Sequence, residues 1–299
     1  DVKRAIDEGY FPGARLVVSQ GCATSGSHGD FTQHLRNKFD LADYLEERSI
    51  SIGNGPDFFR KLVRKQKKYG CDFIKIIATG GFATPHDSPE EQHFSDEELK
   101  AIIETAKEVG LTVTAHAYTG ELITKLVNMG IDGIEHGALI DEKTARLMEQ
   151  KNVYLVPTFC PYDEVINLDE EKLAKKPVEF QAKLRKYSEQ LKESRKIIIN
   201  SKIKLGYGTD FVAVHNNYEC GYEYSAWLRS GVDPFRALKA ATSINAEILQ
   251  LEDKIGTIEP NKYADIAAWK RDLLTDHRAL LDCCFVMKEG VIYDTEKVE

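Results

Sequence analysis

Short apolar runs alternate with amphipathic stretches of helical period along most of the chain. Alternation of this kind predicts right-handed β-α-β units around a largely parallel sheet. The expected strands lie at residues 14–19, 73–81, 111–116, 132–137, 153–156 and 204–210. The expected helices lie at residues 55–70, 95–110, 141–150, 169–200, 219–229 and 234–241, with one more ending at Gly130. The pattern is typical of an α/β barrel.

The C-terminal part follows a different pattern. Two short β segments are expected at 264–269 and 286–293, with a turn at Glu289 and Gly290. We therefore expect a barrel over residues 1–255 and a small β-sandwich unit over residues 256–299.

Two of the expected helices carry further signals. Ser95, three residues before Glu98, forms a capping-box motif, which predicts where the helix 95–110 begins. The stretch 169–200 is rich in lysine and glutamate and is interrupted at Pro177, which predicts a solvated outer helix.

Chemically informative residues lie in or at the ends of four strands. Lys75 lies inside an apolar run, where its charge is costly unless it is removed or paired. Two later strands end at His116 and His136, and a fourth ends at Asp210. Because the carboxyl ends of parallel strands meet at one mouth of a barrel, we expect these four side chains to converge.

Imidazole nitrogens and a carboxylate are suitable ligands for zinc. A lysine amine whose pKa is depressed can add carbon dioxide, and the resulting carbamate can bridge two metal ions. The four residues thus predict a binuclear zinc site, bridged by carboxylated Lys75, in which Asp210 carries a proton. Each residue also has a structural explanation: a satisfied histidine, a helix N-cap at Asp210, or a lysine snorkelling from an edge strand. Their joint occurrence on four strands favours the metal site.

Composition excludes some partners. The 299 residues carry a net charge of −8, which argues against nucleic acid or an anionic membrane as the main partner. No apolar run approaches the about 20 residues that a membrane span needs. The six cysteines show no Cys-x-x-Cys spacing, which favours a reducing compartment. We expect a cytoplasmic homo-oligomer.

Several motifs resemble the amidohydrolase superfamily, and within it the imidazolonepropionase-like and Xaa-Pro dipeptidase-like metal hydrolases, including zinc-dependent arginine carboxypeptidase. The spacings between Lys75, His116 and His136 fit that branch. The segments that carry the resemblance are Gly80-Gly81 after Ile-Lys-Ile-Ile, 92–99, 115–117, 134–137, 208–210, and the tail 249–260 with 264–266.

The resemblance implies a (β/α)8 TIM-type metal-dependent hydrolase barrel with a small β-sandwich. It implies that Lys75 is the carboxylated bridge, that His116 and His136 bind the second metal, and that Asp210 binds the first and shuttles the proton. It also suggests substrate contacts. Those residues are His28, Tyr118, which would reach the scissile carbonyl, and His215.

The chain departs from the family pattern in one respect. No His-x-His pair, which binds the first metal in the family, occurs in the sequence. The strands that begin the family's sandwich are not recognisable either. We expect that the N-terminal part of a longer protein is missing from this sequence; a divergent protein with one metal or none is the alternative.

The expected activity is metal-dependent cleavage of the amide bond of a dipeptide or of a peptide's C-terminal residue. Acidic residues in the expected loops suggest a preference for C-terminal Arg or Lys. These residues are Asp30, Asp163, Glu164 and Glu219. The alternatives are a cyclic amide hydrolase, such as an imidazolonepropionase, and a non-catalytic barrel fragment.

Overall fold

The main sheet is parallel and follows the chain order. The computed structural model describes residues 1–28, 41, 44, 49, 51–166, 170–175, 177–210 and 221–293. Its five strands pair in the order β1-β2-β3-β4-β5. They are β1 (Cys22–Ala23), β2 (Phe73–Ile77), β3 (Thr112–Thr119), β4 (Gly133–Leu139) and β5 (Tyr154–Val156). The sheet and its helices confirm an α/β fold of the TIM-barrel type.

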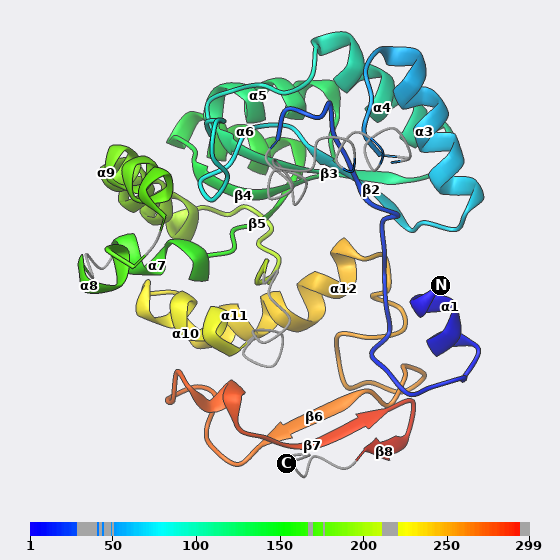
Figure 1. The fold of residues 1–299 in the computed structure, drawn as a ribbon. Helices are drawn as coiled ribbons and strands as arrows, with labels where there is room; N and C mark the ends of the chain where they lie inside the picture. Colours follow the sequence, from blue (N-terminus) through cyan, green and yellow to red (C-terminus); the bar gives the residue numbers. More distant parts are fainter. Residues whose placement is uncertain are drawn as a thin grey trace.

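Helices cover the outer face of this sheet (Figure 1). That layer consists of α3 (Pro56–Lys68), α4 (Asp96–Glu108), α5 (Gly120–Met129) and α6 (Glu142–Lys151). The other described helices are α1 (Val2–Asp7), α7 (Cys160–Ile166), α8 (Glu170–Leu173), α9 (Val178–Asn200), α10 (Gly221–Arg229) and α11 (Pro234–Lys239), which continues through a π turn (Ala240–Ile244) into α12 (Asn245–Ile248). None of the helices in the described ranges is both long and apolar enough to cross a bilayer.

Alternation along β2 places its side chains on two faces of the sheet, one in the hydrophobic core and one in the barrel interior. Ile74 and Ile76 are fully buried in the main hydrophobic core, which also contains residues of α3 and α4. Phe73, Lys75 and Ile77 alternate with them and therefore point to the opposite face, toward the barrel interior. A second hydrophobic cluster lies at the carboxyl ends of β3 and β4 and in the segments that follow the strands. It contains Phe82, Tyr118, Ala138, Leu139, Tyr162, Leu173, Leu184, Tyr187 and Leu191.

Two expected strands are not formed as ladders. Residues 204–210 make a single bridge, Leu205 to Leu155, because the backbone N–H and C=O of Tyr207 bind the side-chain amide of Asn245 instead of a neighbouring strand. Residues 14–19 are extended. Within them only the backbone of Val18 hydrogen-bonds to the segment before β2: its C=O accepts from Asp72 N, and its N–H donates to the Asp72 carboxylate. Both segments follow the sheet direction without joining it as strands.

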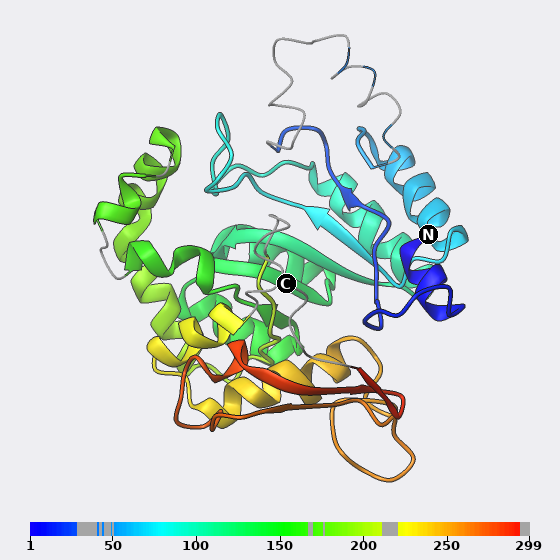
Figure 2. The same ribbon diagram turned by 60° about the horizontal axis from the view of Figure 1, so that its bottom comes forward.

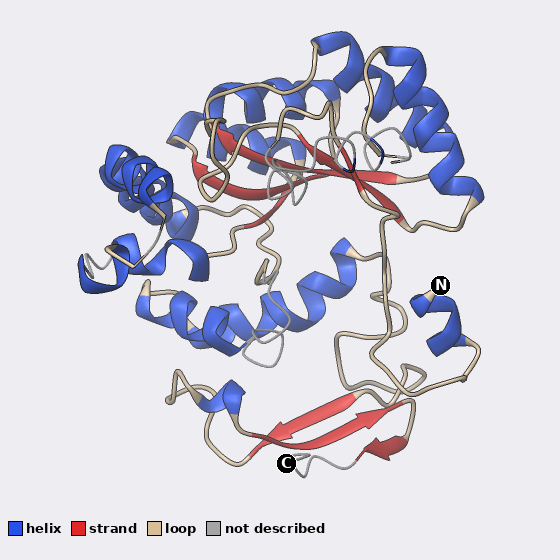
Figure 3. Cartoon of the chain, in the orientation of Figure 1, coloured by secondary structure: helices blue, strands red, loops and turns tan. Residues whose placement is uncertain are grey.

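The C-terminal unit is a three-stranded antiparallel sheet, separate from the main sheet in Figure 3. It consists of β6 (Ile266–Trp269), β7 (Cys283–Lys288) and β8 (Val291–Tyr293), with a 3-10 turn at Ala279–Leu281. The turn between β7 and β8 has positive φ at Glu289 (53°) and Gly290 (85°), as a tight hairpin requires. The hairpin confirms the expected turn, and the sheet fits the expected small sandwich.

Candidate active site

A row of imidazoles lies at the carboxyl ends of the main strands. The rings of His116 on β3 and His136 on β4 are 4.7 Å apart, and His28 follows at 5.1 Å from His116. His93, in the loop after β2, lies 5.9 Å from His28. The structure thus brings the two expected histidine ligands together and adds two more rings beside them.

A cavity of about 220 Å³ lies next to this row. It is lined by Lys75, His136, Asp210 and Thr158, together with Ser19, Phe73, Glu135, Val156 and Gly208. Three of the expected metal residues therefore border one space. Nε2 of His136 lies 3.9 Å from Oδ2 of Asp210 across it.

The backbone around this cavity is unusual. His136, Thr158 and Asp210 have φ of 71°, 44° and 53°, a region that non-glycine residues rarely adopt. Such conformations persist where the surrounding structure enforces them, and they gather at functional sites. Nδ1 of His136 hydrogen-bonds to Oγ1 of Thr158 at 2.7 Å, which directs Nε2 toward the cavity.

Glu135 is a neighbour that the sequence analysis did not single out. Its Oε1 lies 3.8 Å from Nζ of Lys75 and accepts a hydrogen bond of 2.8 Å from Thr114. Strict alternation would place Glu135 and His136 on opposite faces of β4, but the positive φ of His136 lets both border the cavity. The carboxylate thus gives the half-buried Lys75 a partner.

Burial changes the protonation of the site. It lowers the pKa of His116 and His136 well below the usual value, and the charge of Lys75 adds to the effect at both rings. Both rings are therefore neutral near pH 7 and keep a lone pair. Burial also raises the pKa of Asp210, although 54% of its side chain remains exposed.

Tyr118 lies against the histidines rather than in open solvent. Its buried ring stacks on His136, with centroids 5.1 Å apart, and its hydroxyl accepts a hydrogen bond of 2.9 Å from Tyr162. Burial raises the pKa of Tyr118, so the phenol stays protonated. His215 and the acids Asp30 and Glu219 lie outside the described residues.

The candidate ligands have the right chemistry for a divalent metal, but their donor atoms do not converge on one point in the structure. Two neutral imidazoles and a carboxylate are suitable zinc ligands, and the Thr158 contact fixes one ring as a ligand requires. In the part of the chain that the structure describes, no three His, Cys, Asp or Glu side chains are arranged to hold a metal.

Asp163 does not have the role suggested for it. Its carboxylate accepts from Nη1 of Arg195 at 2.8 Å and from Nη2 of Arg229 at 2.5 Å, and it is buried between them. These two guanidinium groups take the place that a substrate arginine or lysine would need. Asp163 therefore links α7, α9 and α10 and is not available to a basic substrate.

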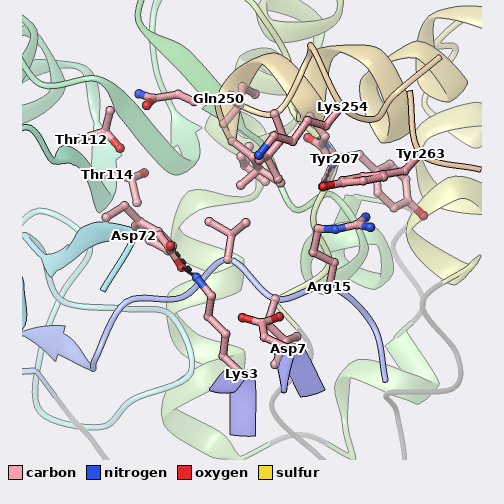
Figure 4. A pocket seen from close by; sticks show the side chains of 18 of the residues that line it. Lys3, Asp7, Arg15, Asp72, Thr112, Thr114, Tyr207, Gln250, Lys254 and Tyr263 are labelled. Carbon is pink, nitrogen blue, oxygen red and sulfur yellow. Dashed lines mark hydrogen bonds and ion pairs between the residues drawn. The ribbon is translucent and has the colours of Figure 1, made fainter. Parts of the chain in front are cut away.

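A larger cavity, about 730 Å³, shares Phe73, Glu135 and Val156 with the cavity next to the imidazole row but extends away from that row (Figure 4). Phe73 and Thr112, the first residues of β2 and β3, line it, as do Lys3 and Asp72, which form an ion pair of 2.6 Å. It therefore opens at the amino ends of the strands. Barrel enzymes carry out their chemistry at the carboxyl ends, so this cavity is not the candidate site.

Comparison with known proteins agrees with this geometry. Ochratoxinase from Aspergillus niger is 28% identical over 253 residues, which are 81% of this chain and 52% of that protein. The chain thus spans about half the length of this curated relative. A Xaa-Pro dipeptidase structure with bound methionine superposes with a TM-score of 0.82 at 27% identity, covering 98% of this chain and 71% of that one. The crystal structure of A. niger ochratoxinase also superposes with a TM-score of 0.82. The sequence identity is 25%, and the superposition covers 98% of this chain and 69% of that one.

A family model matches almost the whole chain. The model of the amidohydrolase family covers residues 1–295, from α1 to beyond β8. With a match of this extent and with that parallel sheet, the chain belongs to the amidohydrolase family.

Proposed function

We propose that the protein hydrolyses an amide bond with the help of bound zinc and releases the C-terminal residue of a dipeptide or short peptide. The observation that supports this most is the single cavity bordered by Lys75, His136 and Asp210 at the strand ends. The names of the similar proteins, a Xaa-Pro dipeptidase and an ochratoxinase, point to the same class of bond.

The metal would be held by His116, His136, Asp210 and the carbamate of Lys75. Bound zinc would polarise the scissile carbonyl and lower the pKa of the attacking water. Asp210 would accept the proton of that water and pass it to the leaving amine, a role that suits its raised pKa. The protonated hydroxyl of Tyr118 would donate to the carbonyl oxygen as charge develops on it.

Substrate binding would fall to His28, which lies between His116 and His93 in the imidazole row. An imidazole N–H can donate to the free carboxylate of the substrate. The side-chain pocket would come from the loops after the strands. Tyr118 and His215 are the other proposed contacts.

Metal content and a substrate screen test the proposal. We expect the protein that carries this sequence to contain two equivalents of zinc and to cleave members of a dipeptide library, but not cyclic imides or imidazolones. Turnover of the cyclic compounds alone would indicate an imidazolonepropionase-like enzyme. A metal-free protein without hydrolase activity would indicate a non-catalytic barrel.

We further propose a preference for C-terminal Arg or Lys. Because Asp163 is already paired, this preference is supported by the three remaining acids of the sequence analysis: Glu164, which the structure places in α7, and Asp30 and Glu219, which lie outside the described residues. A carboxylate in the pocket would bind a basic side chain and repel an acidic one. We expect kcat/KM to be highest for Xaa-Arg and Xaa-Lys among Xaa-Arg, Xaa-Lys, Xaa-Pro, Xaa-Leu and Xaa-Glu. A preference for Pro or Leu would contradict this specificity while leaving the amide hydrolysis standing.

A further inference from the structure

A carboxylate of α10 is completely buried next to the segment that follows β5. Oε1 of Glu223 accepts a hydrogen bond from Phe159 N and Oε2 accepts one from Cys160 N, both at 2.7 Å. Oε1 also accepts from Nε1 of Trp227 at 2.7 Å. Because 0% of Glu223 is exposed, its charge would be costly without such donors. Two of the three donors belong to consecutive peptide units of the connection between β5 and α7.

The same connection is held from α9. Nη2 of Arg195 donates to the carbonyl oxygen of Phe159 at 2.7 Å. Figure 2 shows α7 and α9, in green, next to α10, in yellow. Burial raises the pKa of Glu223 to about 7, whereas its N–H donors and the charge of Arg195 oppose the rise. Above that pH the carboxyl is ionised and accepts all three hydrogen bonds. Glu223 and Arg195 then bind the N–H and the C=O of one residue from two helices.

The hydrogen bond to Phe159 N restricts the backbone of Thr158. This N–H belongs to the planar peptide unit that follows Thr158, and ψ of Thr158 sets the orientation of that unit. Thr158 has a φ of 44°, in a region that β-branched residues rarely adopt and keep only where their surroundings enforce it. Glu223 is therefore one of the groups that enforce this conformation.

Thr158 in turn contacts His136. Its Oγ1 lies 2.7 Å from Nδ1 of the ring, and Nε2 faces Asp210 across the cavity at the strand ends. When Nε2 uses its lone pair to bind a metal ion, Nδ1 carries the ring hydrogen and the Thr158 hydroxyl accepts it. Glu223, the Phe159 peptide unit, Thr158 and His136 thus form a continuous chain of contacts from α10 to the candidate site.

We infer that Glu223 is a positioning residue that holds Thr158 in place, so that Thr158 fixes the His136 ring with Nε2 toward the cavity. A group that orients a ligand histidine acts on metal affinity, whereas a carboxylate that only stabilises the fold does not do so through Thr158. The inference rests on the proposed function only for what Nε2 binds; the orientation of the ring can be measured without metal.

Zinc affinity is the first readout, measured at about pH 8 by competition with a chelator. Glu223→Gln keeps the size of the side chain but turns an N–H donor toward one of the two backbone N–H groups. We expect zinc to bind about 10- to 100-fold more weakly, the usual loss when a ligand histidine is no longer supported. Thr158→Val, which removes the hydroxyl, should give a similar loss, and Thr158→Ser, which keeps it, should bind zinc as the wild type does.

The two changes should not add. Glu223→Gln combined with Thr158→Val should bind zinc no more weakly than Thr158→Val alone, because both act on one contact. Additive losses would overturn the inference. Arg229→Gln is the matched control, since Arg229 lies on the same helix but binds Asp163 in α7. Its zinc affinity should stay within about twofold of the wild type, and a loss equal to that of Glu223→Gln would also overturn the inference.

Crystal structures of the metal-free proteins supply the second readout. In Glu223→Gln, Thr158 should leave the positive φ region, and its Oγ1 should move beyond hydrogen-bonding distance of His136 Nδ1. The contact should remain in Arg229→Gln. An unchanged contact in Glu223→Gln would contradict the inference. A wild type that binds no zinc would count against the proposed function alone, and the structures would still decide this inference. If Glu223→Gln does not fold, Glu223→Asp, whose shorter side chain cannot reach both N–H groups, gives the same comparison.

Discussion

Lys75 illustrates what the sequence reveals about a single residue and what it conceals. A lysine inside an apolar strand is visible as an anomaly, and it pointed to the candidate site. Its partner Glu135 could not be recognised in the sequence, because strict alternation along β4 places Glu135 and His136 on opposite faces. The positive φ of His136 brings both to the cavity, and such a backbone state leaves no mark in residue spacing.

The first prediction concerns Lys75. Carboxylation would replace a cation by an anion 3.8 Å from Glu135, which only bound metal cations can compensate. Carboxylation and metal occupancy should therefore be coupled, and Lys75→Ala should lose metal and activity together. Metal analysis checks this, with the exposed Lys100→Ala as control. Electron density that ends at a bare amine, in a crystal with both metals occupied, would contradict the carbamate.

His93 gives a prediction that needs no metal. Its ring is 8% exposed, and neither ring nitrogen has a hydrogen-bond partner among the described residues. Burial, aided by His28, lowers its pKa from 6.5 to about 4. Between these values the unfolded chain binds the proton and the folded chain does not. Stability should therefore fall as pH drops from 6.5 toward 4, with no contribution from His93 above that window.

Urea unfolding of the metal-free protein between pH 4 and 7 measures the effect. His93 should contribute up to about 1.4 kcal/mol per pH unit to the slope. His93→Gln should reduce the slope of the unfolding free energy against pH by that amount. His86→Gln, at an exposed position, should leave the slope unchanged. Parallel curves for wild type and His93→Gln would show that the ring is protonated in the folded state.

At the scale of elements, the sequence predicted local signals better than tertiary ones. The capping box was found as expected: Ser95 Oγ accepts from Glu98 N, and Glu98 Oε2 accepts from Ser95 N at 2.7 Å. The strand expected at 204–210 was not found, because its partner is a side chain, Asn245, distant in the sequence. Helix α9 is solvated on its outer face, but its inner face carries Lys183, which composition alone did not separate from the other lysines.

The capping box gives the element-scale prediction. Glu98 caps two helices at once, because its Oε1 also accepts from Gly55 N, ahead of α3, at 2.6 Å. Ser95→Ala should cost about 1 kcal/mol, and Glu98→Ala about 2 to 3, since it leaves two backbone N–H groups without a partner. The exposed neighbour Glu97→Ala is the matched control. Equal effects of Glu98→Ala and Glu97→Ala in chemical unfolding would refute the double cap.

At the scale of the whole molecule, the N-terminal segment connects the two sheets. Figure 1 shows it running from the main sheet to the C-terminal sheet. At one end Asp72 binds Lys3 and the backbone of Val18. At the other end Arg15 binds Asp265 and, at 2.5 Å, Glu289. These contacts join residues far apart in the sequence, so no local pattern predicted them, and the division at residue 255 stays a prediction.

Arg15 should therefore control how firmly the C-terminal sheet is held. Its guanidinium also lies over the ring of Tyr263, 4.7 Å from the centroid, and 20% of its side chain is exposed. Arg15→Met would leave Asp265 without its cation, and paired charges of this kind contribute about 1.5 to 3 kcal/mol. Amide hydrogen exchange in β6, β7 and β8 should accelerate about tenfold or more, while β2, β3 and β4 keep their protection.

The exposed Arg4→Met on α1, whose side chain contacts Glu8 within the same helix, is the control and should change neither sheet. Equal acceleration in both sheets would mean that Arg15 supports the molecule as a whole. Unchanged exchange in the C-terminal sheet would mean that β6, β7 and β8 are held by their own packing. Only faster exchange confined to β6, β7 and β8 is consistent with Arg15 as the residue that holds the C-terminal sheet in place, since its two carboxylate partners both belong to the C-terminal unit.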